Sequence, residues 1–389
     1  MEFDKFTANW NYPTNIRQGI GRITELPSVC RKLGITAPLL VTDPGLSQMP
    51  MILNAVEACV NNGLNCKVFA EIVANPTQKN VTDGVIAYKE ANHDGVIAFG
   101  GGSALDAGKA IALMVGQNRP LWDFEEGGSN ASRVNVSGMA PVVAIPTTSG
   151  TGAEVGRTAV ISDSEQQVKR LIFHPNILPD IVILDAQLTV GLPAPLTAAT
   201  GMDALSHALE AYCAPTYHPM AEGIAIAAVG LIKSYLPRAC SNGEDIEARA
   251  QVMVASTMGA TAFQRGLGAM HALAHPLGAV YNCHHGLLNA ILMPYVLQAN
   301  STAIEQKIAH LALCIGLDSP SFECFLAWVV GLKKELNIPH SLAEIGIDLA
   351  QVEQIADMAV KDPCAGGNPI QFSASQYSEI LTAAVTGEL

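Results

Sequence analysis

Basic residues are scarce in this sequence, which has 22 Lys and Arg against 35 Asp and Glu and a formal net charge of −13. No cluster of Lys and Arg interrupts this acidic composition. Because an acidic surface repels phosphodiester backbones, we expect no nucleic-acid partner. Weakly charged stretches such as residues 223–232 are far shorter than the ~20 residues that a membrane span needs. We therefore expect no membrane association.

Signals for secretion and cysteine pairs of the CxxC type are also missing. The first five residues, MEFDK, are not a basic segment followed by an apolar one, so we expect no signal peptide. The nine cysteines are odd in number and stand in no CxxC pair, which indicates reduced, mostly buried thiols and a cytoplasmic protein. Cys283, beside two histidines, is interpreted as a small packing residue.

Apolar residues make up 49% of the 389 positions, which is enough for large buried cores and favours two domains. In the first half, amphipathic stretches such as residues 51–62 and 81–92 separate short apolar runs. These runs are typical of buried parallel strands and lie at residues 38–42, 66–69, 95–99, 142–145 and 181–184. The alternation predicts a doubly wound, Rossmann-like α/β sheet.

The second half has a different texture, rich in Ala, Leu, Met and Glu, with no convincing strand. Its segments of helical length are residues 195–213, 220–235, 245–263, 270–281 and 304–315. The Gly- and Pro-containing residues 191–195 look like a hinge. We therefore predict an α/β dinucleotide-binding domain over residues 1–187 and an all-helical, metal-binding catalytic domain over residues 188–389.

A glycine turn follows the predicted strand 95–99. Gly100, Gly101, Gly102 and Ser103 connect it to a helical pattern that starts at Ala104. Backbone N–H groups of such a turn and the N-terminus of the helix form an anion site, and glycine lets a pyrophosphate approach. A plain strand-to-helix turn is the alternative, although three consecutive glycines are conformationally costly.

Two more loops follow predicted strands. Residues 146–152 contain Thr147 and Thr148 among four hydroxyls and two glycines, and form either a second loop for phosphate or ribose or only a flexible connection. Asp43 follows the strand 38–42, where a carboxylate can accept hydrogen bonds from ribose hydroxyls and repel a 2′-phosphate. Turn formation in Asp-Pro-Gly is the alternative for Asp43.

Histidines and one aspartate recur at helical spacing in the second half. Asp203 and His207 stand four residues apart, as do His271 and His275, and His285 follows His284. Spacing of four places both members of a pair on one helix face. Apolar surroundings disfavour these side chains unless they are paired or bound to metal. One Asp and three His suit a divalent ion such as iron or zinc.

These motifs resemble the iron-containing (group III) alcohol dehydrogenase family over nearly the whole chain. The resemblance rests on residues 100–103 with Asp106 and Lys109, residues 146–148 with 150–154, residues 201–204 with 207–212, and residues 271–278 with His285 and Gly286. It implies the fold shared by iron-type alcohol dehydrogenases and dehydroquinate synthase, with the active site in the cleft between the two domains. It further implies a homodimer or a higher homo-oligomer.

By this resemblance, Fe²⁺, or Zn²⁺ in its place, is held by Asp203, His207, His271 and His285. His275 lies near the metal and the nicotinamide without being a ligand, and is the candidate for proton transfer. The positions that match contacts to NAD are Asp43, Asn75, Gly101, Gly102, Ser103, Asp106, Thr147, Thr148 and Lys169. The implied reaction is reversible hydride transfer between a small primary alcohol or hydroxy acid and NAD, which interconverts alcohol and aldehyde.

The sequence departs from the family pattern near the expected substrate pocket. The segment from Phe263 to Gly268 is one residue shorter than usual and carries Arg265, and His284 stands where many relatives have a small residue or proline. Phe263 and Arg265 are therefore candidate substrate residues. Arg265 has three possible roles: it binds a substrate carboxylate, it pairs with a nearby Glu or Asp, or it touches the cofactor phosphates.

Two other enzyme classes join a nicotinamide cofactor to a metal. A lyase resembling dehydroquinate synthase would need several cations for a phosphorylated substrate, but residues 201–300 contain only Lys233, Arg238, Arg249 and Arg265. A zinc polyol dehydrogenase resembling glycerol dehydrogenase fits a set of four protein ligands less well. A non-catalytic binding protein would have no reason to keep both sites.

Overall fold

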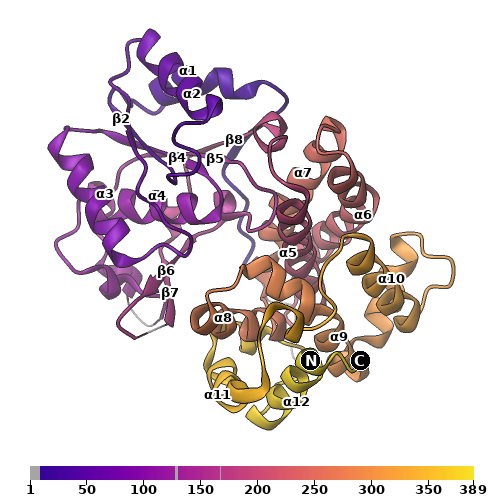
Figure 1. Cartoon of the computed structure of the whole chain (residues 1–389). Helices are drawn as coiled ribbons and strands as arrows, with labels where there is room; N and C mark the ends of the chain where they lie inside the picture. Colours follow the sequence, from indigo (N-terminus) through magenta and orange to yellow (C-terminus); the bar gives the residue numbers. More distant parts are fainter. Residues whose placement is uncertain (1–8, 128–129, 167) are drawn as a thin grey trace, which may run out of the picture. The chain divides into compact units, whose positions relative to one another are not determined.

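The computed structural model describes residues 9–127, 130–166 and 168–389, and they form two compact units. The α/β unit comprises residues 13–148 and 152–191, coloured indigo to magenta in Figure 1. The helical unit comprises residues 192–389, together with Ser149–Thr151 and the described residues before Pro13. The chain passes from one unit to the other at Gly191 and Leu192, four residues after the predicted boundary.

A six-stranded sheet forms the centre of the α/β unit. Its strands are β1 (Asn15–Gln18), β8 (Ile181–Leu184), β5 (Val142–Pro146), β4 (Gly95–Gly100), β2 (Pro38–Val41) and β3 (Lys67–Phe69), in this spatial order. All paired neighbours are parallel. Every residue of β2, β4, β5 and β8 is buried, as expected for strands covered on both faces. The predicted Rossmann-like parallel sheet is confirmed.

Helices α1 (Leu26–Lys32), α2 (Pro50–Asn61), α3 (Gln78–Glu90) and α4 (Gly102–Met114) connect these strands. Sequence patterns did not reveal β1 or the antiparallel hairpin of β6 (Thr158–Asp163) and β7 (Val168–Phe173). The four residues of β1 are mostly polar because it is an edge strand. The hairpin strands are half-exposed and β7 carries two cations, so neither forms a purely apolar run.

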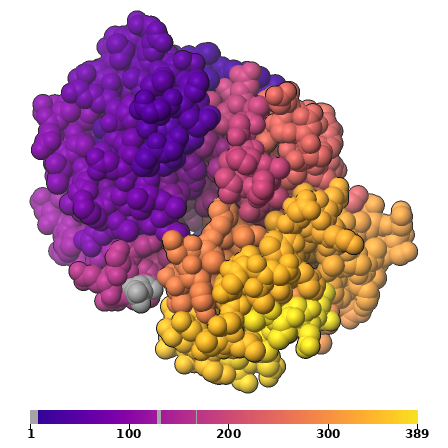
Figure 2. Space-filling view, viewed as in Figure 1, coloured from indigo at the N-terminus to yellow at the C-terminus, as the bar shows by residue number. Residues whose placement is uncertain are grey.

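The second unit is built from helices. The structure describes all of its residues from 192 to 389. The helices are α5 (Ala194–Cys213), α6 (Pro219–Ser241), α7 (Ile246–Ala262), α8 (Ala269–Tyr281), α9 (His285–Cys314), α10 (Phe322–Glu335), α11 (Val352–Lys361) and α12 (Ala374–Thr386). Their apolar faces form one buried cluster, to which α5 and α9 contribute most of their length. On the face shown in Figure 2, the later helices of this unit appear in orange to yellow.

Helix α9 is much longer than its prediction, which covered only residues 304–315. It begins at His285 and continues through Pro294 without ending. The ring of His284 caps it, because Nδ1 accepts a hydrogen bond from the backbone N–H of Leu287. A capping role explains a histidine at this position without invoking substrate.

Helix α6 is long and apolar enough, by length and composition alone, to cross a membrane. It packs along α5 and α7, and Ala225, Val229 and Ile232 on its inner face are fully buried in the helical core. A core helix of this kind passes the same test, so α6 is weak evidence for a membrane span.

Candidate functional site

Helices α5 and α8 bring three of the four predicted metal ligands together. One ligand atom from each of Asp203, His207 and His271 lies within 4.8 Å of the other two, and all three side chains are buried. The rings of His207 and His271 stack with centroids 4.8 Å apart. One turn of α5 separates Asp203 from His207, so both project from the same face.

His285 completes the group as the first residue of α9. Its Nε2 lies 3.8 Å from Oδ1 of Asp203, and its ring centroid lies 5.2 Å from that of His271. The following Gly286 permits this approach, since an added Cβ would come within 2.5 Å of the carbonyl oxygen of Ala199 on α5. The four predicted ligands therefore converge from three helices.

Asn289 is a member of this cluster that the sequence analysis missed. Its Nδ2 lies 2.8 Å from Oδ1 of Asp203, 3.1 Å from Nε2 of His285 and 3.2 Å from Nε2 of His271. The side chain is fully buried and its Oδ1 has no hydrogen-bond partner. The spacing of four from His285 on a helix was the available signal. Three of the four predicted ligands thus lie within hydrogen-bond distance of one amide nitrogen.

Burial and a neighbouring carboxylate shift the pKa values of two imidazoles in the cluster. Burial lowers the pKa of His207 to about 4, so this ring is neutral at neutral pH and available as a ligand. Burial also lowers the pKa of His271, but the neighbouring Glu210 raises it and the net shift is upward. One carboxylate and three imidazoles form an N/O donor set that fits divalent iron or zinc.

His275 lies on α8, one turn after His271. Its ring stacks on His285 with centroids 5.4 Å apart and planes 13° apart. Its Nδ1 donates a hydrogen bond of 2.8 Å to Oδ2 of Asp362, just after α11. Burial raises the pKa of Asp362, but the hydrogen bond and the charge of His275 outweigh burial and hold that pKa below its usual range. Asp362 stands in a distant segment with no motif of its own, so it was also missed.

The glycine turn between β4 and α4 has the geometry of a cradle. Gly100 has φ +152°, and an added Cβ would lie 2.8 Å from Cβ of Ala104, so glycine is required here. The N–H of Thr147 donates to the carbonyl of Gly100. Thr148 lies 3.5 Å from where a Cβ of Gly101 would stand. The predicted residues Gly101, Gly102, Ser103, Thr147 and Thr148 thus meet at the carboxyl ends of β4 and β5.

Asp43 lies beside this turn. Its Oδ1 accepts a hydrogen bond from the N–H of Leu46, as expected for a residue that forms the Asp-Pro-Gly turn. Its Oδ2 lies 3.6 Å from a Cβ built on Gly100. Ser162 of β6 bridges to Thr77, two residues after Asn75, and pairs with Lys169 of β7. Asn75 has φ 55°, in the left-handed region.

Asp106 has structural partners on the hairpin side of α4. Its Oδ2 accepts a hydrogen bond from the N–H of Val160, and its Oδ1 lies 3.0 Å from Nζ of the fully buried Lys109. Lys109 also donates to the carbonyls of Ala153 and Thr158. Asp106 and Lys109 therefore hold the segment before β6 and the first half of β6 on α4. Contact of Asp106 with the cofactor stays a prediction.

Of the two predicted substrate residues, only Phe263 lies at the metal cluster. Its ring centroid is 5.2 Å from that of His207. The side chain of Arg265 is 4% exposed, donates to Glu222 at 2.7 Å and donates to the carbonyl of Thr216 at 2.8 Å. This geometry favours the second of its three roles, pairing with a nearby carboxylate.

Comparison with known proteins places the chain in a family. The model of the iron-containing alcohol dehydrogenase family matches residues 13–186, and the model of the C-terminal domain of that family matches residues 197–385. The chain is 38% identical to the 4-hydroxybutyrate dehydrogenase of Cupriavidus necator, over 95% of this chain and 98% of that protein. It is 36% identical to the NAD-dependent methanol dehydrogenase of Bacillus methanolicus, over 94% and 97%. A crystal structure of a 1,3-propanediol oxidoreductase superposes with a TM-score of 0.91 at 32% identity, over 97% of this chain and all of that one.

The chain therefore belongs to the iron-containing alcohol dehydrogenase family, as its motifs predicted. It is a metal-dependent oxidoreductase acting on alcohols, and the lyase alternative is not favoured. The family is named for its iron, as predicted, and the relative from Bacillus methanolicus is named as NAD-dependent.

Proposed function

We propose that this enzyme interconverts a short primary alcohol and its aldehyde with NAD, at a divalent metal ion held by Asp203, His207, His271 and His285. The observation that carries the proposal is the convergence of these ligand atoms, with Asp203, His207 and His271 buried, beside the ring of His275. The bound metal supplies Lewis acidity that lowers the pKa of the alcohol hydroxyl, and NAD supplies the hydride acceptor.

His275 acts in this scheme as the proton acceptor. Its Nδ1 hydrogen is committed to Asp362, so the lone pair lies on Nε2. Nε2 would accept the proton that the alcohol loses. Asp362 fixes the ring orientation and stabilises the charged imidazolium, as a carboxylate partner does in other histidine bases.

In the α/β unit, the glycine turn at Gly101 and Gly102 with Ser103 holds the pyrophosphate of NAD at the N-terminus of α4. Thr147, Thr148, Asn75 and Lys169 contact the remaining parts of the cofactor. The position of Asp43 beside Gly100 supports its contact with the adenosine ribose, where its charge disfavours a 2′-phosphate.

The substrate is a small primary alcohol, and relatives named for methanol, 1,3-propanediol and 4-hydroxybutyrate support this size. Pairing of Arg265 with Glu222 removes the sequence argument for a carboxylate anchor at this residue. Iron is the native metal, but zinc can replace it, since zinc lies above iron in affinity for N/O ligands.

A spectrophotometric screen for NADH formation tests the proposal. The enzyme is prepared without oxygen, loaded with Fe²⁺ and assayed at mildly alkaline pH. The panel contains methanol, ethanol, 1,3-propanediol and 4-hydroxybutyrate. We expect turnover of at least one primary alcohol, abolished by a chelator and restored by Fe²⁺. Absence of metal-dependent NADH formation across a wide alcohol panel would refute the proposal.

We further propose that the enzyme acts in the cytoplasm as a homodimer or larger homo-oligomer. The nine free cysteines support a reducing compartment. Light scattering on the eluting peak of a size-exclusion column gives the mass of the assembly, and a monomer of 40.9 kDa would contradict the oligomer.

A further inference from the structure

Glu210 is a buried carboxylate with two different partners at the start of α8. It lies on α5, three residues after His207, and its side chain is 4% exposed. Oε2 accepts a hydrogen bond of 2.6 Å from Nδ1 of His271, and Oε1 accepts one of 2.7 Å from the backbone N–H of Met270. One side chain thus holds both the ring of a predicted ligand and the backbone beside it.

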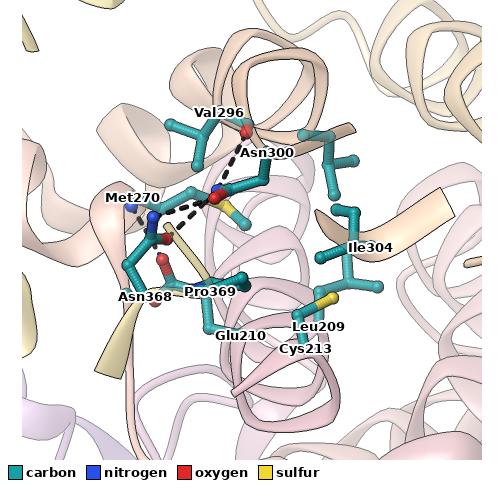
Figure 3. Close-up of a pocket in the computed structure, with 11 residues that line it drawn as sticks. Leu209, Glu210, Cys213, Met270, Val296, Asn300, Ile304, Asn368 and Pro369 are labelled. Atoms are coloured by element: carbon teal, nitrogen blue, oxygen red, sulfur yellow. Dashed lines mark hydrogen bonds between the residues drawn. The ribbon is translucent and has the colours of Figure 1, made fainter. Parts of the chain in front are cut away.

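The surroundings of Glu210 leave it little freedom (Figure 3). The amides of Asn300 and Asn368 pair with each other, and Oδ1 of Asn368 accepts a hydrogen bond from the N–H of Ala269, the first residue of α8. A Cβ built on Gly268 would lie 3.1 Å from Oε1 of Glu210. The cavity that these residues line is about 10 Å³, the lower limit for one water molecule. Bulk water therefore does not compete for the carboxylate.

These contacts fix where the proton of His271 lies. A carboxylate only accepts hydrogen bonds, so Nδ1 of His271 carries the hydrogen, and in the neutral ring Nε2 carries the lone pair. The other side of the ring agrees. Nδ2 of Asn289 donates a hydrogen bond to Oδ1 of Asp203, so this side chain presents its NH₂ group to the cluster. The same Nδ2 lies 3.2 Å from Nε2 of His271, where a donor faces an acceptor. The lone pair of His271 thus points into the ligand cluster.

We propose that Glu210 is a positioning residue of the metal site: by accepting the Nδ1 hydrogen of His271, it holds the ring in the tautomer whose Nε2 binds the metal. The inference rests on the proposed metal site and adds the residue that tunes its affinity. A carboxylate behind a ligating imidazole orients the ring and increases its basicity, and loss of such a partner typically weakens metal binding about 10- to 100-fold. A purely structural Glu210 would cap α8 and have no effect on the tautomer.

The test compares Glu210→Gln with the wild type after removal of metal by a chelator. Each protein is titrated with Zn²⁺ against a competing chromophoric chelator, which reports affinity independently of alcohol turnover. The glutamine can still accept from Met270, but its amide group donates toward Nδ1 of His271 and favours the opposite tautomer. We expect the affinity for Zn²⁺ to fall about 10- to 100-fold.

Glu222→Gln is the matched control, since Glu222 pairs with Arg265 in the same unit, outside the ligand cluster. We expect it to bind Zn²⁺ like the wild type. Equal affinities of Glu210→Gln and Glu222→Gln would overturn the proposal. A wild type that binds no metal would instead refute the metal site itself.

A second measurement needs no folded variant at position 210. In metal-free wild type labelled with ¹⁵N-histidine, the two ring nitrogens of His271 report the tautomer directly, with the signals assigned by their loss in His271→Gln. At a pH where the ring is neutral, we expect a protonated Nδ1 and an unprotonated Nε2. The reverse tautomer would overturn the proposal, whatever the behaviour of Glu210→Gln.

Discussion

Nδ1 of His275 lies 2.8 Å from Oδ2 of Asp362, although 87 residues separate the two in the chain. Asp362→Asn keeps the shape of this partner but removes its charge. We expect kcat to fall about 100-fold, because the histidine loses the group that orients it and stabilises its charged form. Steady-state kinetics measures the loss. Metal content should stay at the wild-type level.

Asp357→Asn is the control for that variant, because Asp357 is an exposed residue of the adjoining helix α11. It should leave kcat unchanged. Equal kcat values for Asp362→Asn and the wild type would show that His275 does not depend on this carboxylate.

Asp43 should set the preference for NAD over NADP. Its Oδ2 lies beside Gly100 at the glycine turn, where its charge would oppose a 2′-phosphate. In Asp43→Gly, we expect kcat/KM for NADP to rise by about one order of magnitude, the equivalent of about 1.4 kcal/mol. The ratio of kcat/KM for the two cofactors is the measurement. Equal use of both by the wild type would contradict this role.

His271→Ala should remove metal and activity together. The ring supplies one of three buried ligand atoms that lie within 4.8 Å of each other, and alanine offers no donor. Metal analysis after exhaustive dialysis checks the first effect, and the alcohol assay checks the second. His310→Ala, which changes an exposed histidine of α9, should retain its metal. Full metal occupancy in His271→Ala would disprove the ligand assignment.

Arg265→Ala should act on stability and not on substrate choice. The guanidinium is buried and donates to Glu222 and to two backbone carbonyls, so its loss removes three hydrogen bonds. We expect the free energy of unfolding to fall by about 3 kcal/mol, measured by urea denaturation. Losses in kcat/KM should be equal for 4-hydroxybutyrate and for a neutral alcohol of the same length. A loss confined to the hydroxy acid would restore a substrate role.

Because of Lys333, the stability of the folded protein should rise with pH in the alkaline range. Burial lowers the pKa of Lys333 to about 8, and its Nζ donates to the carbonyls of Ile291 and His340. The unfolded chain, with an ordinary lysine pKa, binds a proton between pH 8 and 10.5 that the folded protein lacks, so folding becomes more favourable as pH rises through this window. Across this window, we expect the free energy of unfolding of the wild type to rise by about 3 kcal/mol relative to that of Lys333→Met. Parallel stability curves of the two proteins would contradict this expectation.

Much of the fold follows from local sequence patterns. The apolar runs that became β2, β4, β5 and β8 were recognisable because strands buried on both faces need apolar side chains at every position. Helix α9 was only partly recognised, because its apolar residues do not gather on one face and Pro294 stands within it. Its start depends on the cap by His284 and on packing against α5 at Gly286, and neither is visible as a period in the sequence.

The sequence by itself indicated a metal site and the glycine turn, because Asp203 and His207, like His271 and His275, are neighbours on a helix surface at a spacing of four. Which of these residues bind the metal was implied only by the family resemblance. Only the tertiary structure revealed Glu210, Asn289 and Asp362, whose roles depend on contacts with residues far away in the chain. It also favoured one of the three roles that the sequence left open for Arg265, pairing with a carboxylate, because Glu222 lies beside it. Helical spacing is a local property that a sequence displays, whereas the partner of a buried charge is chosen by the packing of separate helices.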